Sequence, residues 1–232
     1  MSTPNPFLAS NAGGSTIEPV PAGLQAAILT GLYDLGWQYN EKYDKNSKKV
    51  VFRFEFPLLP HLKGKTKEGV EFDLPRVLNK QLTNSLHEKA TMRLMVESWI
   101  GRKLTAAEVK DGLDLTKLLG RSCTVQVMHE TKADGSIRAE FNTVIPYQGQ
   151  KLTTATKPLL FSVTQLKTAA ELDTLGLPEW IVKIVKEGDA YKKLAGKASV
   201  ASAPASTDTS GPSGEASPFD PAPADDSDSV PF

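Results

Sequence analysis

Residues Lys49–Phe56 read KVVFRFEF and form the clearest strand pattern in the chain. The apolar side chains that alternate along this stretch are Val50, Phe52, Phe54 and Phe56. Because successive side chains of a strand point to opposite faces, this stripe predicts a face that packs in a core. Arg53 then lies on the opposite face. Pro57 and Pro60 end the strand, since proline cannot donate to a strand ladder.

Further strand patterns lie on both sides of this stretch. We expect strands over residues 24–39 with a bend at Gly36, over 70–82 with an edge or bulge at Pro75, over 122–129, over 136–147 and over 159–163. The intervening segments 41–48 and 61–69 are interpreted as a polar turn, centred on Asn46, and a basic loop. Asp134-Gly135 is a strong hairpin signal and joins the two strands that flank it.

Helical patterns fall between and after these strands. Residues 83–99 carry apolar side chains at helical spacing, and Gly101 follows as a stop. Thr105 and Glu108 have the spacing of a capping box, in which each side chain bonds a backbone N–H of the other residue. We expect a short helix from Thr105 that ends at Gly112, a further short turn from Asp114 through Leu119, and two or three short helices within 169–195, where Pro178 suits a first turn.

The fold class that this order predicts is mainly β with α: an OB-fold five-stranded barrel with an inserted helix and short C-terminal helices, followed by a disordered acidic tail. A generic α+β sheet is the alternative that the pattern leaves open. The expected organisation is a flexible lead-in over 1–22, a nucleic-acid-binding domain over 23–197, a disordered linker over 198–224 and an acidic tip over 225–232.

Charge divides the chain into two parts. The 27 Lys and Arg residues all precede residue 198, whereas six of the 27 acids lie beyond it. Residues 1–197 therefore carry a net charge of +6 and residues 198–232 carry −6. A basic body is consistent with a polyanionic partner such as nucleic acid, although an ordinary domain with a solubilising tail has the same balance.

The last eight residues combine acids with an apolar end: Asp225, Asp226, Ser227, Asp228, Ser229, Val230, Pro231 and Phe232. A small apolar pocket with a basic rim would accept the Phe232 ring, pair its α-carboxylate and attract the aspartates. This ending resembles the acidic C-terminal tip of bacterial single-stranded DNA-binding proteins, in which a run of Asp precedes Ile-Pro-Phe. The resemblance implies that the partner-docking residues Asp225, Asp226, Asp228, Val230, Pro231 and Phe232 recruit replication or repair proteins.

The body resembles a different group, the phage-encoded OB-fold single-stranded DNA-binding proteins. The segments that carry this resemblance are Asp34–Gly36, Phe54–Pro57, Ser85–Ala90, Glu97–Arg102, Leu118–Cys123 and Leu177–Trp180. The resemblance implies an accessory protein of phage replication or recombination in the host cytoplasm. It does not identify the residues that touch DNA.

Binding of single strands without sequence preference needs cations for phosphates and aromatic faces for bases. The candidates are Trp37, Tyr39, Tyr43, Arg53, Lys63, Lys65, Arg76, Lys80, Lys89, Arg93, Arg102, Lys132 and Arg138. Trp37 and Tyr39 share a row with Tyr33 and Leu35, which suits a core as well as a groove. The lysines of 61–69 and the cations of the helix also suit solvated surfaces.

Other chemistry finds little support in the sequence. The three His and one Cys lack the spacing of a zinc site, and no phosphate-binding loop or nucleophile elbow occurs. We therefore expect no catalytic residues, no cofactor, no metal and no enzyme activity. A single-strand annealing protein, a nuclease and a non-enzymatic adaptor are the alternative functions. The lone Cys123 suits a reducing compartment, and no apolar run is long enough for a membrane span. Oligomeric state and the choice between DNA and RNA stay open.

Overall fold

The computed structural model describes residues 18–41, 44–65, 69–154 and 156–201. The strands are β1 (Gly23–Asn40), β2 (Lys45–Glu55), β3 (Leu62–Lys65), β4 (Glu71–Leu74), β5 (Val77–Thr83), β6 (Ser122–Thr131), β7 (Ile137–Pro146) and β8 (Leu159–Ser162). The helices are α1 (Thr91–Ile100), α2 (Ala106–Asp111), α3 (Glu171–Thr174), α4 (Glu179–Glu187) and α5 (Asp189–Ala201). The prediction of a mainly β protein with some helices is confirmed.

One sheet organises the molecule. Its order is β5-β2-β1-β6-β7, every neighbouring pair on this path is antiparallel, and β8 pairs in parallel with β1. Within the described residues no strand ladder joins β5 to β7, so the sheet does not close into the expected barrel. The two edges approach through side chains, since Lys80 Nζ donates to Asn142 Oδ1 at 3.1 Å.

The strand β2 is buried on both of its faces. Its inner face carries the predicted aromatic stripe, and Phe52, Phe54 and the following Phe56 have no exposed surface. Its outer face carries Val51 and Glu55, which are also buried. The alternation that predicted one buried face is therefore correct, but the second buried face follows from what packs against it.

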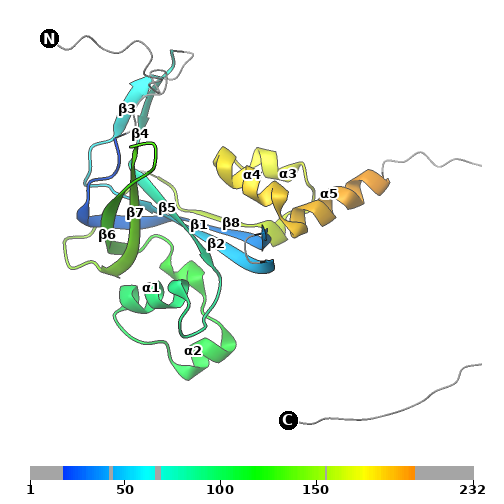
Figure 1. The fold of residues 1–232 in the computed structure, drawn as a ribbon, viewed down its shortest axis with the longest axis horizontal. Helices are drawn as coiled ribbons and strands as arrows, with labels where there is room; N and C mark the ends of the chain where they lie inside the picture. The colour runs from blue at the N-terminus through cyan, green and yellow to red at the C-terminus, as the bar shows by residue number, and fades with distance from the viewer. Residues whose placement is uncertain (1–17, 42–43, 66–68, 155, 202–232) are drawn as a thin grey trace, which may run out of the picture.

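Two groups of helices cover the two faces (Figure 1). α1 closes the first core, in which Trp99 packs at 5.7 Å from Phe54 between ring centroids. The C-terminal helices α3, α4 and α5 lie at one end of the sheet and close a second core, which contains Tyr33, Leu35 and Val51. The β3–β4 hairpin projects from the other end of the molecule.

A bulge at Gly36 changes the direction of the side chains along β1. The register between β1 and β2 shifts between Asp34 and Gly36, and Gly36 has a φ of 71°, which a glycine adopts without strain. The predicted bend is thus a bulge inside one continuous strand. Tyr33 and Leu35 lie on the outer face before the bulge, whereas Trp37 pairs with Lys48 on the inner face after it.

Several helix caps, turns and strand ends lie where the sequence predicts them. Gly101 caps α1 in the left-handed conformation, with a φ of 72°, and Thr105 and Glu108 form the capping box at α2. The Asp134-Gly135 turn joins β6 to β7, with Gly135 N donating to Lys132 O at 2.9 Å. Pro75 separates β4 from β5, as a residue unable to donate to a ladder should.

Other expectations are wrong. The helix predicted from residue 83 begins at Thr91, because residues 77–83 complete the edge strand β5. The predicted basic loop over 61–69 contains β3, which pairs with β4. Asn46, expected at the centre of a turn, lies in β2 opposite Tyr39. Thr83, Asn46 and the residues of β3 each have a cross-strand partner, which outweighs their local preference.

The aromatic contacts of Phe54 yield a stability prediction. Phe54 also meets Phe141 of β7 edge-on, with ring centroids 5.2 Å apart, so Phe54→Ala removes the ring contacts to both α1 and β7. We expect the free energy of unfolding to fall by about 3–5 kcal/mol in denaturant titrations. The exposed Leu58 is the control, and Leu58→Ala should cost less than about 0.5 kcal/mol. Equal losses in the two variants would contradict the assignment of the core.

Candidate nucleic-acid interface

Three adjoining clefts follow the edge strand β5, and we call them together the β5 groove. The central cleft, of about 520 Å³, lies between β5, β7 and α4. A cleft of about 280 Å³ shares Val77, Leu78 and Arg138 with it at one end. A cleft of about 420 Å³ shares Gln81 with it at the other end. The shared lining residues make the groove continuous along β5.

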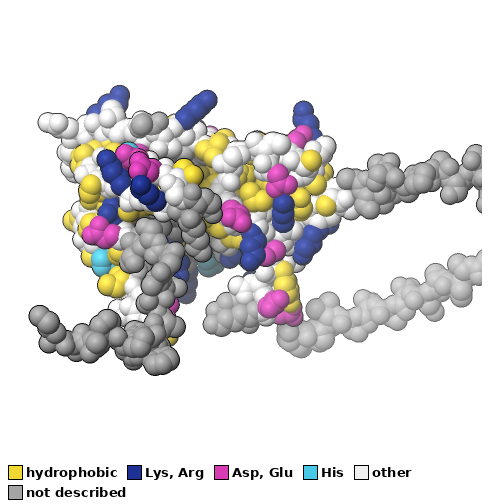
Figure 2. Space-filling model, turned by 90° about the horizontal axis from the view of Figure 1, so that it is seen from above, with side chains coloured by type: hydrophobic (Ala, Val, Ile, Leu, Met, Phe, Trp, Pro, Cys, Tyr) yellow, Lys and Arg dark blue, Asp and Glu magenta, His cyan; other side chains and the backbone are white. Residues whose placement is uncertain are grey.

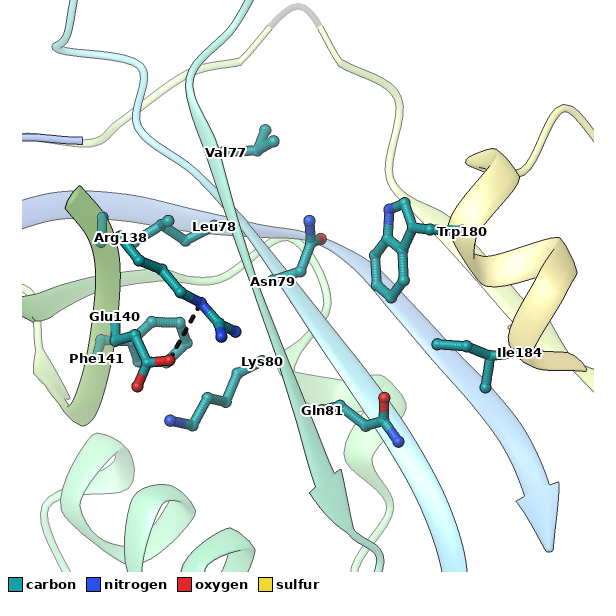
Figure 3. Close-up of a pocket in the computed structure, with 11 residues that line it drawn as sticks. Val77, Leu78, Asn79, Lys80, Gln81, Arg138, Glu140, Phe141, Trp180 and Ile184 are labelled. Atoms are coloured by element: carbon teal, nitrogen blue, oxygen red, sulfur yellow. Dashed lines mark ion pairs between the residues drawn. The ribbon is translucent and has the colours of Figure 1, made fainter. Parts of the chain in front are cut away.

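The strand β5 divides the central cleft into two sides (Figure 3). Lys80 extends toward β7, whereas Asn79 and Gln81 extend toward α4. This separation follows from the alternation of side chains along a strand. The two sides therefore differ in chemistry although one short strand provides both.

The β7 side is charged. Arg138 and Glu140 face Lys80 across the cleft, and Arg138 Nε lies 3.2 Å from Glu140 Oε1. Lys80 Nζ also lies 5.7 Å from the centre of the Phe141 ring. Two cations thus face one carboxylate among the charged residues that line this cleft.

The α4 side is aromatic and polar. Pro178 precedes α4, and Ile181 and Val185 form the stripe of this helix that is buried in the second core. Trp180 and Ile184 lie four residues apart on the neighbouring stripe and face β5 across the cleft. Trp180 is 38% exposed, so part of its surface is open to a ligand in the cleft.

Both ends of the groove carry lysines. Lys132 lines the smaller end cleft together with Arg138, next to the turn between β6 and β7. Lys49 and Lys89 line the other end cleft, at the segment that connects β5 to α1. The structure thus brings five predicted residues into one groove, which are Arg76, Lys80, Lys89, Lys132 and Arg138, with Arg76 buried in its wall.

Arg53 adjoins this groove without lining it. It pairs with Asn79 of β5 and with Gly31 of β1, so the three residues form one row on the outer face. Its Nε is buried and has no hydrogen-bond partner within the described part of the chain. Burial raises the pKa of the neighbouring Tyr33, and the Arg53 guanidinium opposes that shift.

The predicted aromatic residues lie apart from α4. Trp37 and Tyr39 are 55% and 56% exposed near the end of β1, on the same face of the strand. The Tyr39 hydroxyl donates to Asp44 Oδ1 at 2.6 Å, and this bond raises the pKa of Tyr39. Tyr43 lies outside the described residues. The sequence left open whether the row of Tyr33, Leu35, Trp37 and Tyr39 faces the core or a groove. Because of the bulge, Tyr33 and Leu35 lie in the core, whereas Trp37 is accessible.

Three predicted arginines have structural partners. Arg76 is 6% exposed and donates to Pro60 O at 3.0 Å and to the backbone and carboxylate of Glu18. It thereby fixes the end of the expected lead-in, where Val20 is buried. Arg102 forms a two-point ion pair with Glu108 at 2.8 and 2.7 Å. Arg76 is therefore buried with its partners, whereas Arg102 is paired with Glu108 and still half exposed.

Arg93 belongs to a cluster centred on the buried Glu97. Glu97 accepts from Lys103 Nζ at 2.9 Å, from Leu104 N at 3.0 Å and from Arg93 Nε at 2.9 Å. These three bonds, that of Lys103 foremost, lower the pKa of Glu97 from 4.5 to about 2. The cluster ties α1 to the segment that precedes α2.

Lys63 and Lys65 project from the β3–β4 hairpin and are paired with acids. Lys63 Nζ lies 3.4 Å from Asp73 and Lys65 Nζ lies 3.0 Å from Glu71. His61 also contacts Asp73, at 2.6 Å, and lowers the pKa of that carboxyl. The hairpin is therefore not the uniformly basic arm that its lysines suggest.

Sequence reasoning missed several residues of the groove that could bind a nucleotide, among them Lys49, Asn79, Gln81 and Trp180. Asn79 and Gln81 alternate with Lys80 in the sequence. This pattern indicates a strand with amides on one face and a cation on the other. Trp180 and Ile184 lie beside the apolar stripe of an amphipathic helix, which is a signal of a second contact surface. No sequence signal places α4 opposite β5.

The charges of both signs are mixed on the surface that Figure 2 shows, where Lys and Arg side chains are interspersed with Asp and Glu. Within the described residues no group of three His, Cys, Asp or Glu side chains could hold a metal ion. No helix in that part of the chain has the length and apolar character to cross a membrane. The tip residues 225–232 lie outside the described residues.

No family model matches this chain, and a search of curated proteins finds no match.

The Glu97 cluster gives a prediction about pH. Since the folded protein holds the pKa of Glu97 below its ordinary value, the carboxylate stabilises the fold above about pH 4.5, and this contribution is lost as the pH falls toward 2. We expect Glu97→Gln to lower the melting temperature at pH 7 and the difference from the parent protein to shrink as the pH falls through this range. The exposed Glu88→Gln is the control, and a Glu97→Gln deficit that is independent of pH would contradict the role of the charge.

Proposed function

We propose that the protein binds single-stranded DNA in the β5 groove. The observation that carries this proposal is the arrangement around β5, with an accessible indole and two amides on one side and Lys80 and Arg138 on the other. Unpaired bases can stack on aromatic rings while cations bind the phosphates, which is the combination that non-specific single-strand binding requires. In a duplex the bases are paired and stacked on each other, so Trp180 would have no base to stack on.

The strand order supports a specific fold within this proposal. We interpret β1, β2, β5, β6 and β7 as the five strands of an OB fold that is open between β5 and β7. Their pairing order is third-second-first-fourth-fifth, and α1 lies between the third and fourth strands. OB folds bind oligonucleotides on the face of strands two and three and with the loops that join strands one to two and four to five.

The candidate residues fit that location. The groove follows β5, the third strand, and reaches Lys132 at the turn between the fourth and fifth strands. Trp37 and Tyr39 lie next to the connection between the first and second strands and are exposed. We propose Trp180 and Trp37 as stacking residues and Lys80, Arg138, Lys132, Lys49 and Lys89 as phosphate ligands.

Removing cations from the groove tests this function. We expect Lys80→Ala with Arg138→Gln to weaken binding of labelled oligo-dT about tenfold or more, measured by fluorescence anisotropy at low salt. The slope of log affinity against log salt should also fall by about 1.4, since each phosphate contact contributes about 0.7 for a single strand. The phosphate attraction should make the parent protein release the strand as salt rises.

The matched control uses two cations that are paired with acids on the hairpin. Lys63→Ala with Lys65→Ala changes the net charge as much as the groove variant does, but should leave the affinity within about twofold of the parent. Equal losses in the two double variants would mean that overall charge, rather than the groove, attracts the DNA. Absence of binding by the parent protein in dilute buffer would contradict the proposal itself.

We propose that residues 225–232 recruit replication or repair proteins. This recruitment and the resemblance of residues 23–185 to phage single-stranded DNA-binding proteins both support a role in replication or recombination. A peptide of residues 225–232 should bind an apolar pocket with a basic rim on such a partner. Burying a Phe ring contributes about 1.5–3 kcal/mol, so Phe232→Ala should weaken this peptide about tenfold or more in a titration. Equal binding by both peptides would show that the aspartates act alone and would refute the docking of the ring.

A further inference from the structure

The α4 side of the central cleft is suited to a flat polar ligand. Trp180 and Ile184 provide one wall, and the side chains of Asn79 and Gln81 face them from β5. The charged residues of the cleft, Lys80, Arg138 and Glu140, lie on the other side of β5. A phosphate would therefore be attracted to the β7 side, which leaves the α4 side for a base.

The two amides are available for hydrogen bonds. Among the described residues, neither Asn79 nor Gln81 uses its side-chain amide in a hydrogen bond, and both side chains are exposed. Each amide offers a donor and an acceptor side by side, which matches the paired donors and acceptors on the edges of nucleobases. Cations alone would bind any strand equally, whereas amides beside a stacking surface can distinguish one base from another.

The spacing of the amides favours a large base. Residues two apart on a strand lie about 6.6 Å from each other, so one ligand must present two polar edges to reach both amides. A purine has Watson–Crick and Hoogsteen edges, and Asn or Gln can bond the N6 and N7 atoms of adenine at two points. A pyrimidine has a smaller ring to lie on the indole and lacks a Hoogsteen edge of this kind.

We propose that the α4 side of the β5 groove is a nucleobase pocket that prefers purines, with Trp180 as the stacking surface and Asn79 and Gln81 as the residues that read the base. This inference rests on the proposed single-strand binding and adds a base preference to it.

The test compares oligo-dT with a strand of equal length in which every third thymidine is replaced by deoxyadenosine. We expect the full-length protein to bind the adenine-containing strand about fivefold or more tightly, the lower end of the discrimination that a two-point base contact provides. Asn79→Ala with Gln81→Ala should bring the ratio of the two affinities to within about twofold of one, because the loss of affinity falls mainly on the adenine-containing strand.

Two further variants separate recognition of the base from attraction of the phosphates. Trp180→Ala should weaken binding of both strands and reduce the ratio, because stacking is lost for every base but more area is lost for a purine. Lys80→Ala with Arg138→Gln should weaken both strands equally and keep the ratio. A melting curve for each variant shows whether it is folded, and the exposed positions of Asn79 and Gln81 predict no change for that pair.

The outcomes distinguish this inference from the proposed function. Equal affinity of the parent protein for the two strands overturns the purine preference and leaves single-strand binding in place. A preference that survives in the folded Asn79→Ala, Gln81→Ala variant also overturns it, since the amides would then not read the base. Failure of the parent protein to bind either strand overturns the proposed function.

Discussion

Burial of β2 on both faces is the constraint on which the rest of the structure depends. The inner face packs Phe52 and Phe54 against α1, and the outer face packs Val51 under the C-terminal helices. The strand β2 lies inside the sheet, where β1 and β5 pair with its two edges. The helices that complete the second core then determine where α4 stands relative to β5.

The open edge of the sheet is the consequence that matters for function. Because β5 pairs with β2 on one side and, among the residues that the structure describes, has no strand ladder on the other, its polar side chains and those of β7 line a cleft instead of closing a barrel. The second core fixes α4 through Ile181 and Val185, and this anchoring presents Trp180 to the cleft. Stability and the candidate site therefore share one helix, whose buried stripe supports the fold while the neighbouring stripe faces the groove.

Local patterns predicted the parts of the fold that local chemistry determines. The alternation of β2, the glycine cap after α1, the capping box at Thr105 and the Asp134-Gly135 turn are all present. The strand β5 was not predictable in this way as far as Thr83, because its pairing with β2, more than 20 residues earlier, decides it. The bulge at Gly36 shifts the side chains of β1 to the opposite faces from that residue onward. A regular alternation of side chains along a strand cannot predict this shift.

The candidate site shows the same division. Lysines that the sequence proposed for phosphate binding do meet along β5, whereas Arg76, Arg93 and Arg102 are held by carboxylates or carbonyls. Composition identifies a cation but not its partner, so sequence reasoning cannot separate these two groups. Trp180 was missed because its role depends on how α4 is placed against the sheet.

Photo-crosslinking of a strand that contains 4-thiothymidine, followed by mass spectrometry of the joined peptides, tests the location of the DNA most directly. The account predicts crosslinks concentrated in peptides from β5 and the first turn of α4, with Trp180 among the modified residues. Crosslinks confined to the β3–β4 hairpin or to the α1–α2 region, with none in β5 or α4, would contradict it.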